Sequence, residues 1–353
     1  MARPVFISLD EVKSVLTWSL VNESIEEAFK SVVVGKDKLT KYQNHPYAYQ
    51  NARTVTKTQN EKVWLYTMPG YIGNHKVTLE DVKRKAFETV ACKLLTWSGI
   101  NNQLNPAIPN ILSNILLFDE KTGQLKCIMD GDLITAWRTA SASVVATKYL
   151  YFGRRSVNAS DGVILAIIGC GVQGKSHALG MCTEFKVNEI RLWNRTAKKA
   201  VDLSTHQDNA RKTFVNPNLK VTVCHTVGEC VANADIIVTC SDMEKPLLHL
   251  NMLKDDVHIN AVGVSVNHYS ELGQDIYDVA PVYIDSWAGA KTELAGLKTN
   301  LVCEVGEVIF DGGMCPKQGI SVFQSLGMAV EDAAVAQAVY QKLKRNNQIT
   351  SKI

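Results

Sequence analysis

The sequence predicts an α/β fold built from two domains, one of which is discontinuous. In the second half of the chain, apolar strand-like runs alternate with helical stretches, which is typical of βαβ units. One of these runs, Val163–Ile168, leads directly into a glycine-rich turn. The last helical stretch, 322–345, is too apolar for an exposed tail, so we expect it to pack back on the first half of the chain.

Length, composition and charge indicate which class of protein this is and which partners it is expected to lack. A chain of 353 residues suits two domains, each with its own core. Its 46% hydrophobic and 21% charged residues are typical of a globular enzyme. The 38 Lys and Arg residues nearly balance 35 Asp and Glu residues, and no apolar run approaches the roughly 20 residues of a membrane span. We therefore expect neither a nucleic-acid partner nor a membrane partner.

The first domain is expected to mix helices and strands. Ser8 and Glu11 form a capping-box pattern that opens a helix. A hairpin is predicted around Glu120-Lys121-Thr122-Gly123, between apolar flanks. Residues 81–97 show a mixed pattern that favours neither a helix nor a strand, and the start of this segment is charged. The other expected elements are helices at 8–19, 23–35 and 132–151 and strands at 53–58 and 62–69. Residues 1–150 with 322–353 form this domain, and a polar linker at 153–162 opens the second domain, 151–321.

The glycine motif follows the apolar run Val163–Ile168 and precedes a helical stretch. Glycines also mark ordinary turns, but a strand, a glycine turn and a helix in this order form the place where a Rossmann-type domain holds a dinucleotide pyrophosphate. Further strand-like runs follow at 219–224, 235–239, 258–262 and 281–285. The predicted contacts come from Gly169, Gly171, Val172, Gln173 and Gly174.

The end of the next strand-like run indicates which dinucleotide is bound. An NAD site uses a carboxylate there to accept a hydrogen bond from the ribose 2′-hydroxyl. This chain has neutral Asn194, followed by Arg195, Thr196 and Lys198. Guanidinium, hydroxyl and ammonium donors would hold a 2′-phosphate, which a carboxylate would repel. The expected cofactor is therefore NADPH.

Three cations in the first half of the chain, Arg53, Lys93 and Arg138, lie among apolar or small residues. Buried cations require anionic partners, so a substrate carboxylate is one candidate. The alternatives are snorkelling to solvent or ion pairs with Asp119, Asp130 or Asp132.

The nine cysteines lack metal-ligand spacing and indicate reduced, buried thiols, so we expect a cytoplasmic protein without a metal. The N-terminus shows no signal-peptide core. The C-terminal Ser351-Lys352-Ile353 differs by one residue from the peroxisomal address Ser-Lys-Leu, which makes the peroxisome the alternative location.

The chain resembles the ornithine cyclodeaminase/mu-crystallin family, and within it the mu-crystallin (ketimine reductase) branch. The resemblance spans nearly the whole chain. Its more specific stretches are Met129-Asp-Gly-Asp-Leu-Ile-Thr-Ala-Trp-Arg-Thr-Ala140 and Phe323-Gln-Ser-Leu-Gly-Met-Ala-Val-Glu-Asp332; other matching stretches are Ala52-Arg-Thr-Val55, Ile168-Gly-Cys-Gly-Val-Gln173, Arg191-Leu-Trp-Asn-Arg-Thr196 and His258-Ile-Asn-Ala-Val-Gly263.

The resemblance implies roles for particular residues. Arg53, Lys93 and Arg138 match the family's carboxylate-binding cations, and Leu326 matches a backbone contact to the substrate. Val262 and Ser265 join the predicted cofactor-binding residues. The resemblance also implies a homodimer joined through the sheets of the substrate domains.

Some positions depart from the family pattern. Ser265 stands where the cyclodeaminase branch has an aspartate, which puts ornithine cyclisation in doubt. Asn110-Ile111-Leu112 replaces a polar stretch, residues 74–91 are longer than expected, and Trp137 is bulkier than its usual counterpart. We expect the last three changes to alter substrate selectivity.

The function expected from these residues and this resemblance is NADPH-dependent reduction of a ketimine carboxylate to a secondary amino acid. Lys93 is the first candidate for setting the protonation of the imine, although a role in binding the carboxylate alone fits equally well. One alternative is an ornithine cyclodeaminase or an amino-acid dehydrogenase. The other is an NADPH-regulated binding protein for an iodothyronine-like (thyroid hormone) ligand, or a structural crystallin.

Overall fold

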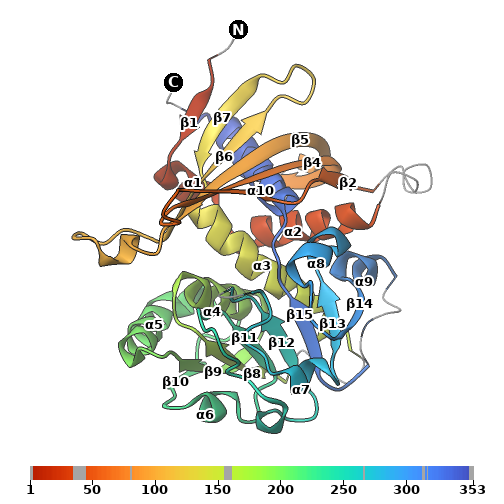
Figure 1. Ribbon diagram of the computed structural model, residues 1–353. Coiled ribbons are helices and arrows are strands. Elements are labelled where there is room, and N and C mark those ends of the chain that lie inside the picture. The colour runs from red at the N-terminus through yellow and green to blue at the C-terminus, as the bar shows by residue number, and fades with distance from the viewer. Residues whose placement is uncertain are drawn as a thin grey trace. The chain divides into compact units, whose positions relative to one another are not determined.

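Figure 1 shows the protein as a computed structural model, which describes residues 3–34, 45–79, 82–154, 161–264, 267–311, 315 and 317–349. The chain divides into two compact units, Met1–Arg138 with Met328–Ile353 and Thr139–Gly327. These units divide the chain at 138 and 327, whereas the sequence placed the divisions at 150 and 321. Within the described residues, no helix is long and apolar enough to cross a membrane. Ser351–Lys352–Ile353 lie outside the described residues.

The first unit is built on a seven-stranded sheet in the order β1-β7-β6-β5-β4-β2, with β3 paired to β4. Among the described strands of this sheet, β1 and β7 pair in parallel and the other pairs are antiparallel. The strands are β1 Val5–Ile7, β2 Tyr47–Gln50, β3 Thr54–Lys57, β4 Trp64–Leu79, β5 Val82–Trp97, β6 Ile111–Phe118 and β7 Leu125–Asp130.

The predicted hairpin of β6 and β7 is confirmed, and Gly123 adopts the positive φ that its turn requires. The mixed character expected for 81–97 is wrong, because β5 is one long strand paired with both β4 and β6. Charged residues at the start of a strand carry no signal of pairing with partners far along the chain, so the pattern was misleading.

One face of this sheet is covered by helices α2 Trp18–Val33 and α10 Ala329–Arg345, which pack on β4, β5 and β6. The alternation along β6 buries Ser113, Ile115 and Leu117 on the helix side.

Helix α1 Leu9–Val15 begins at the predicted cap, since Ser8 and Glu11 form the reciprocal capping box. The break between the first two helices was predicted too late. It falls at Leu16 and Thr17, because the Thr17 side chain caps α2 by accepting a hydrogen bond from the Leu20 amide (3.3 Å).

The second unit holds an eight-stranded, fully parallel sheet in the order β10-β9-β8-β11-β12-β15-β13-β14. Helix α3 Asp132–Leu150 leads into it. The strands are β8 Val163–Ile168, β9 Val187–Trp193, β10 Lys220–Val223, β11 Ile236–Thr239, β12 His258–Ala261, β13 Pro281–Ile284, β14 Asn300–Glu304 and β15 Ser321–Gln324; the helices are α4 Val172–Glu184, α5 Ala197–Ala210, α6 Val227–Val231, α7 Gln274–Tyr277, α8 Trp287–Glu293 and α9 Val305–Asp311.

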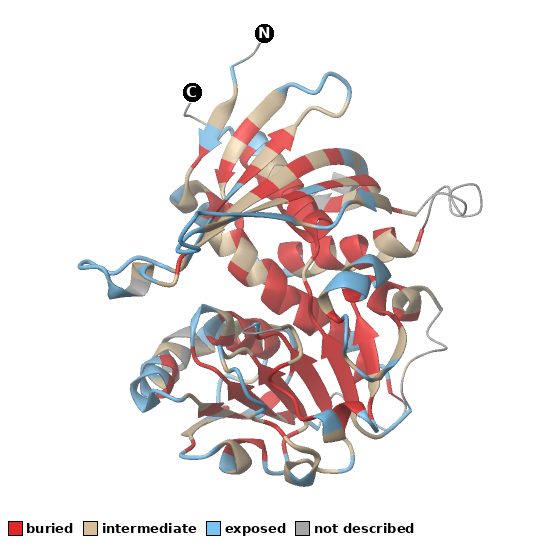
Figure 2. Cartoon of the chain, viewed as in Figure 1, coloured by how far each residue is buried: buried red, intermediate tan, exposed pale blue. Residues whose placement is uncertain are grey.

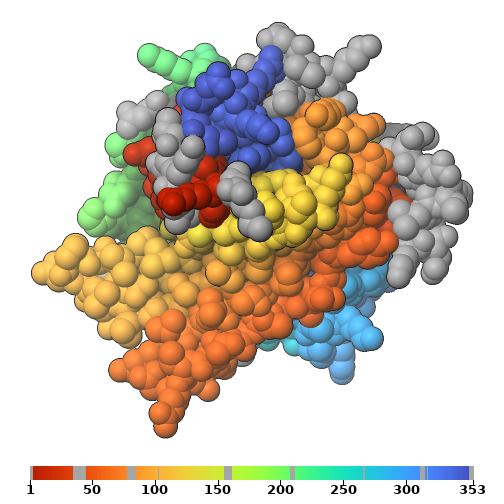
Figure 3. Space-filling view, turned by 90° about the horizontal axis from the view of Figure 1, so that it is seen from above, coloured from red at the N-terminus to blue at the C-terminus, as the bar shows by residue number. Residues whose placement is uncertain are grey.

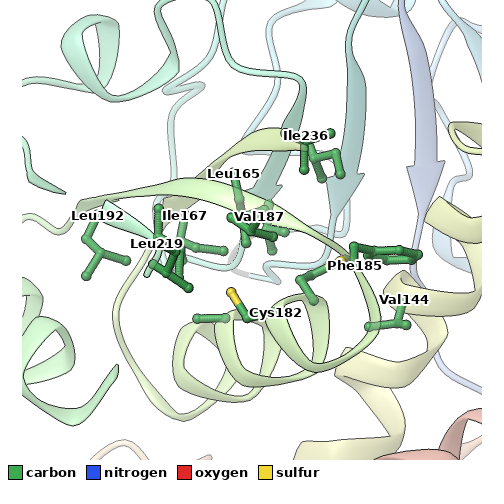
Figure 4. Close-up of a cluster of buried hydrophobic side chains, with 14 of the residues drawn as sticks. Val144, Leu165, Ile167, Cys182, Phe185, Val187, Leu192, Leu219 and Ile236 are labelled. Carbon is green, nitrogen blue, oxygen red and sulfur yellow. The ribbon is translucent and has the colours of Figure 1, made fainter. Parts of the chain in front are cut away.

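The central strands of this sheet are buried on both faces, as Figure 2 shows. Leu165 and Ile167 of β8 point to one side and pack with Cys182 of α4 and with Phe185, which directly follows that helix (Figure 4). Ala166 and Ile168 join the second cluster on the opposite side. This arrangement confirms the predicted α/β fold with a parallel, doubly covered sheet.

One predicted element is corrected. Residues 322–345 were expected to form a single helix, but 321–324 form strand β15 between β12 and β13, and α10 starts only at Ala329. A short apolar run that is buried on both faces has the same pattern in a strand as in a buried helix, so periodicity alone could not separate them.

Candidate functional site

The glycine turn after β8 can be built only with glycine at two positions. Gly169 has a φ of +105°, which L-residues rarely adopt. A Cβ atom on Gly174 would lie 2.0 Å from the carbonyl oxygen of Gly169, so helix α4 could not approach the strand. At Gly171, by contrast, a Cβ atom would meet no other atom within 4 Å, so this glycine borders open space.

The N-terminus of α4 fits an anionic group. Its N-cap is Gly171, which offers no side chain to its first amides, and Val172 is 67% exposed. Uncapped amides at a helix N-terminus attract phosphate. Buried His177 lies one turn further on, with Nδ1 2.8 Å from the Gln173 carbonyl oxygen and Nε2 2.9 Å from Ser143 Oγ. Burial lowers the pKa of His177 to about 4, so the ring is neutral near pH 7. Its two hydrogen bonds hold the first turns of α4 in place.

A pocket in the second unit joins this turn to the end of β9. It is lined by Gly169 and Gly171, by residues 193–196, by Lys199 and by residues 240–243 after β11. Asn194 links two sides of the pocket, because its Oδ1 accepts a hydrogen bond from the Cys170 amide (2.9 Å) and its Nδ2 donates to the Thr196 carbonyl (3.0 Å).

The cations near the pocket are arranged differently from the sequence prediction. Exposed Arg195 donates to the Met243 sulfur (3.3 Å). Lys198 is not among the lining residues, and its ammonium lies 3.0 Å from Asp202 one turn along α5. The next residue, Lys199, lines the pocket instead.

Sequence reasoning missed the segment after β11 and the buried acid that holds it. Glu271 accepts hydrogen bonds from the amide and hydroxyl of Ser241 (both 2.6 Å) and from the Gly263 amide (2.8 Å). Burial raises the pKa of Glu271. The position of residues 240–243 at the carboxyl end of a strand next to β8 was the signal that could have identified them. Val262 is buried beside this segment, and Ser265 lies outside the described residues.

Two of the three predicted cations are buried in the first unit with acidic partners. Lys93 is 1% exposed, and its Nζ lies 2.7 Å from Asp332 Oδ2. Arg138 Nη1 lies 2.9 Å from Glu331 Oε2, and its Nε lies 3.3 Å from Asp332 Oδ1. Asp332 therefore bridges both cations.

The predicted ion-pair partners were the wrong acids. Asp132 accepts from the amide and hydroxyl of Ser113, and Asp119 pairs with Lys126. Asp130 accepts from the Asp132 amide (3.1 Å). The actual partners, Glu331 and Asp332, lie in the first turn of α10, far along the chain. Nothing in the local sequence around Lys93 or Arg138 could have identified them.

The charges of Arg138 and Arg53 both act on Lys93. The pKa of Lys93 is lowered to about 8, mainly by burial and also by the charges of Arg138 and Arg53, while Asp332 opposes the shift. Arg53, half-buried between β2 and β3, is therefore close enough for its charge to act on Lys93.

The start of α10 is fixed to the sheet, which holds the two acids in position. The Val330 amide donates to Gln50 Oε1 (3.2 Å) at the end of β2. Gly70 of β4 lets the helix approach closely, because a Cβ there would lie 3.0 Å from Ala329 Cβ. On the neighbouring α3, the bulky Trp137 stacks on Trp18 with ring centroids 4.2 Å apart.

Leu326 lies in the second unit, directly after β15. Its amide and that of Gly327 both donate to Asp285 Oδ2, at 2.7 and 2.6 Å. Asp285 is fully buried, and burial raises its pKa. This carboxylate fixes the turn at Leu326, for which the family resemblance implies a backbone contact to the substrate.

The chain is similar to several characterised proteins over most or nearly all of its length. Ketimine reductase mu-crystallin of Rattus norvegicus is 34% identical over 343 residues, 96% of each chain. Delta(1)-pyrroline-2-carboxylate reductase of Bacillus cereus is 28% identical over 271 residues, 73% of this chain and 78% of that protein.

Structural similarity extends over nearly the full length. The Delta(1)-pyrroline-2-carboxylate reductase of Thermococcus litoralis, in complex with NADH and L-proline, is 25% identical and superposes with a TM-score of 0.80, covering 98% of this chain and 99% of that one. An archaeal alanine dehydrogenase shares the fold at 22% identity and a TM-score of 0.79 over 99% of both chains. The sequence model of the ornithine cyclodeaminase/mu-crystallin family matches residues 3–347. This chain therefore belongs to the ornithine cyclodeaminase/mu-crystallin family.

Proposed function

We propose that this protein reduces ketimine carboxylates to secondary amino acids with NADPH. The observation that carries the proposal is the gathering of Arg53, Lys93 and Arg138 in the first unit of a chain whose second unit contains a dinucleotide-type pocket. Ketimine reductase mu-crystallin and Delta(1)-pyrroline-2-carboxylate reductase, to which the chain is similar, are named for reactions of this class.

The first unit supplies binding and proton control in this proposal. Arg138 and Arg53 hold the substrate carboxylate, and a guanidinium can do so with two parallel hydrogen bonds. Glu331 and Asp332 keep Arg138 and Lys93 oriented before substrate binds, so little ordering is left for the binding step.

Lys93 keeps the imine nitrogen protonated, because a protonated iminium is the better electrophile. Bound nicotinamide supplies the hydride. The second unit holds the dinucleotide at the glycine turn and at the end of β9.

An NADPH oxidation assay tests the activity directly. Cyclic imine carboxylates, pyruvate with amines, and ornithine are supplied separately, and proline and ammonia are measured beside NADPH oxidation. Turnover of imine carboxylates with little product from ornithine is expected. Robust proline formation from ornithine without imine reduction would assign a cyclodeaminase instead, and binding of an iodothyronine without turnover of any substrate would assign a binding protein.

The coenzyme preference rests on the end of β9. Among the described pocket residues, Asn194 occupies the place of an NAD-type carboxylate, and Arg195 and Thr196 follow it. The structure of the Thermococcus litoralis relative is a complex with NADH, so the proposed preference for NADPH rests on these side chains of this chain and not on that relative.

Arg195→Ala is expected to weaken NADPH binding about tenfold or more, since a charge-assisted hydrogen bond contributes roughly 1.5–3 kcal/mol. NADH affinity should change less than about twofold, because that coenzyme has no 2′-phosphate. Titration of both coenzymes into wild type and variant measures this. Equal losses for the two would mean that Arg195 only shapes the pocket.

A homodimer joined through the first unit's sheet is part of the proposal. The face opposite α10 exposes apolar residues, among them Leu65 of β4 and Leu112 of β6, which lie in one row across the sheet. Figure 3 looks onto a face where the residues of β4 to β7, orange to yellow, lie at the surface. Apolar patches of this kind favour association with a second copy. Light scattering at micromolar concentration should give twice the mass of the chain. A mass equal to that of one chain would exclude the homodimer.

A further inference from the structure

Two adjacent lysines at the start of α5 have different environments. The ammonium of Lys198 is paired with Asp202, with both side chains largely exposed. Lys199 lines the pocket with Arg195 and Thr196. Its backbone amide donates to the Thr196 carbonyl (3.0 Å), which fixes the first turn of the helix at the pocket wall.

Lys199 lines the same pocket as Gly169 and Gly171 of the glycine turn. In the part of the chain that the structure describes, its ammonium forms no ion pair. Burial raises the pKa of the Cys170 thiol to about 12, and the positive charge of Lys199 acts against that rise. Cys170 lies between Gly169 and Gly171, which line the same pocket as Lys199, so the pKa shift agrees with the geometry of the pocket.

The charge balance of the pocket requires a second cation if it is to bind a phosphate dianion. Its charged lining residues are Arg195, Lys199 and Asp242. Arg195 alone would only offset the carboxylate of Asp242, whereas Arg195 and Lys199 together leave one net positive charge. The guanidinium of Arg195 donates to a thioether sulfur, a weak acceptor that a phosphate oxygen would readily replace.

We propose that Lys199, together with Arg195, binds the 2′-phosphate of the coenzyme and sets the preference for NADPH, and that Lys198 has no part in it. The inference rests on the proposed use of NADPH and names a specificity-determining residue for it. Thr196, which lines the pocket between Arg195 and α5, is the third donor.

The test is calorimetric titration of the full chain with adenosine 2′,5′-bisphosphate and with 5′-AMP, which differ only by the 2′-phosphate. Lys199→Met is compared with the matched control Lys198→Met; both positions are exposed. Lys199→Met should weaken bisphosphate binding about tenfold and change 5′-AMP binding less than about twofold. Lys198→Met should leave both affinities unchanged.

The outcomes separate the inference from the proposed function. Wild-type protein that binds the two nucleotides equally overturns the NADPH preference and the role of Lys199 with it. If wild type prefers the bisphosphate but Lys199→Met keeps that preference, the preference stands and the role of Lys199 is overturned. A loss in Lys198→Met as large as that in Lys199→Met also overturns it, because the effect would then come from general surface charge.

Discussion

Arg138→Lys is expected to lower kcat/KM for imine carboxylates by roughly ten- to a hundredfold, mainly through KM, with NADPH affinity unchanged. A lysine keeps the positive charge between Glu331 and Asp332 but cannot copy the forked pair of donors that a carboxylate accepts. The loss of one charge-assisted hydrogen bond, about 1.5–3 kcal/mol, gives this factor. Steady-state kinetics with saturating NADPH measures it.

The lysine variant is preferable to Arg138→Ala. Removing the guanidinium altogether leaves Glu331 and Asp332 buried without this partner, which costs about 3–5 kcal/mol of stability. A loss of activity in that variant could then come from unfolding and not from a lost contact with the substrate.

Arg154→Lys is the matched control, because Arg154 is a fully buried arginine of the second unit that is paired with Asp256 and has no proposed contact with substrate. The control should lose stability and keep its kcat/KM. If Arg138→Lys behaves in the same way, Arg138 is a structural ion pair and the proposed carboxylate contact is wrong.

The parts of the fold that the sequence predicted are those whose signals are local. The capping box at Ser8, the turn at Gly123 and the βαβ alternation after Val163 each depend on residues within one turn or one strand. The misassigned parts, β5 and β15, depend on partners elsewhere in the chain: β5 pairs with β4 and β6, and β15 enters the sheet between β12 and β13. Apolar content alone does not specify such pairing.

The same difference between local and long-range signals explains which parts of the candidate site could be predicted. The glycine turn and the residues at the end of β9 could be proposed from the sequence, because they follow consecutive strands. The charge partners of Lys93 and Arg138 were not, because Glu331 and Asp332 reach them only when α10 packs on the sheet. Lys198 and Lys199 could not be distinguished either, since adjacent helical residues point about 100° apart and only the position of α5 decides which one faces the pocket.

Lys93 is expected to control the pH dependence of kcat/KM for imine reduction, and its replacement is expected to have the largest effect on activity. Burial lowers the pKa of Lys93 to about 8, from an ordinary value of 10.5. If its protonated form maintains the iminium, kcat/KM should be level below about pH 8 and fall about tenfold per pH unit above it. Lys93→Met should lose roughly 10²–10⁴-fold in activity, the usual contribution of a positioned acid.

Unfolding at high pH would not explain that fall, as the sign of the proton linkage shows. Between about pH 8 and 10.5 the unfolded chain holds the Lys93 proton and the folded chain does not, so this group makes stability rise with pH in that window. Thermal melts across the window therefore serve as the control. Lys93→Arg separates Lys93 from a titrating substrate, because arginine stays protonated throughout. Any activity that it retains should lack the limb near pH 8. A limb that persists in Lys93→Arg, or a wild-type profile that stays level to about pH 9.5, would remove Lys93 from proton transfer and leave it only as a partner of the substrate carboxylate.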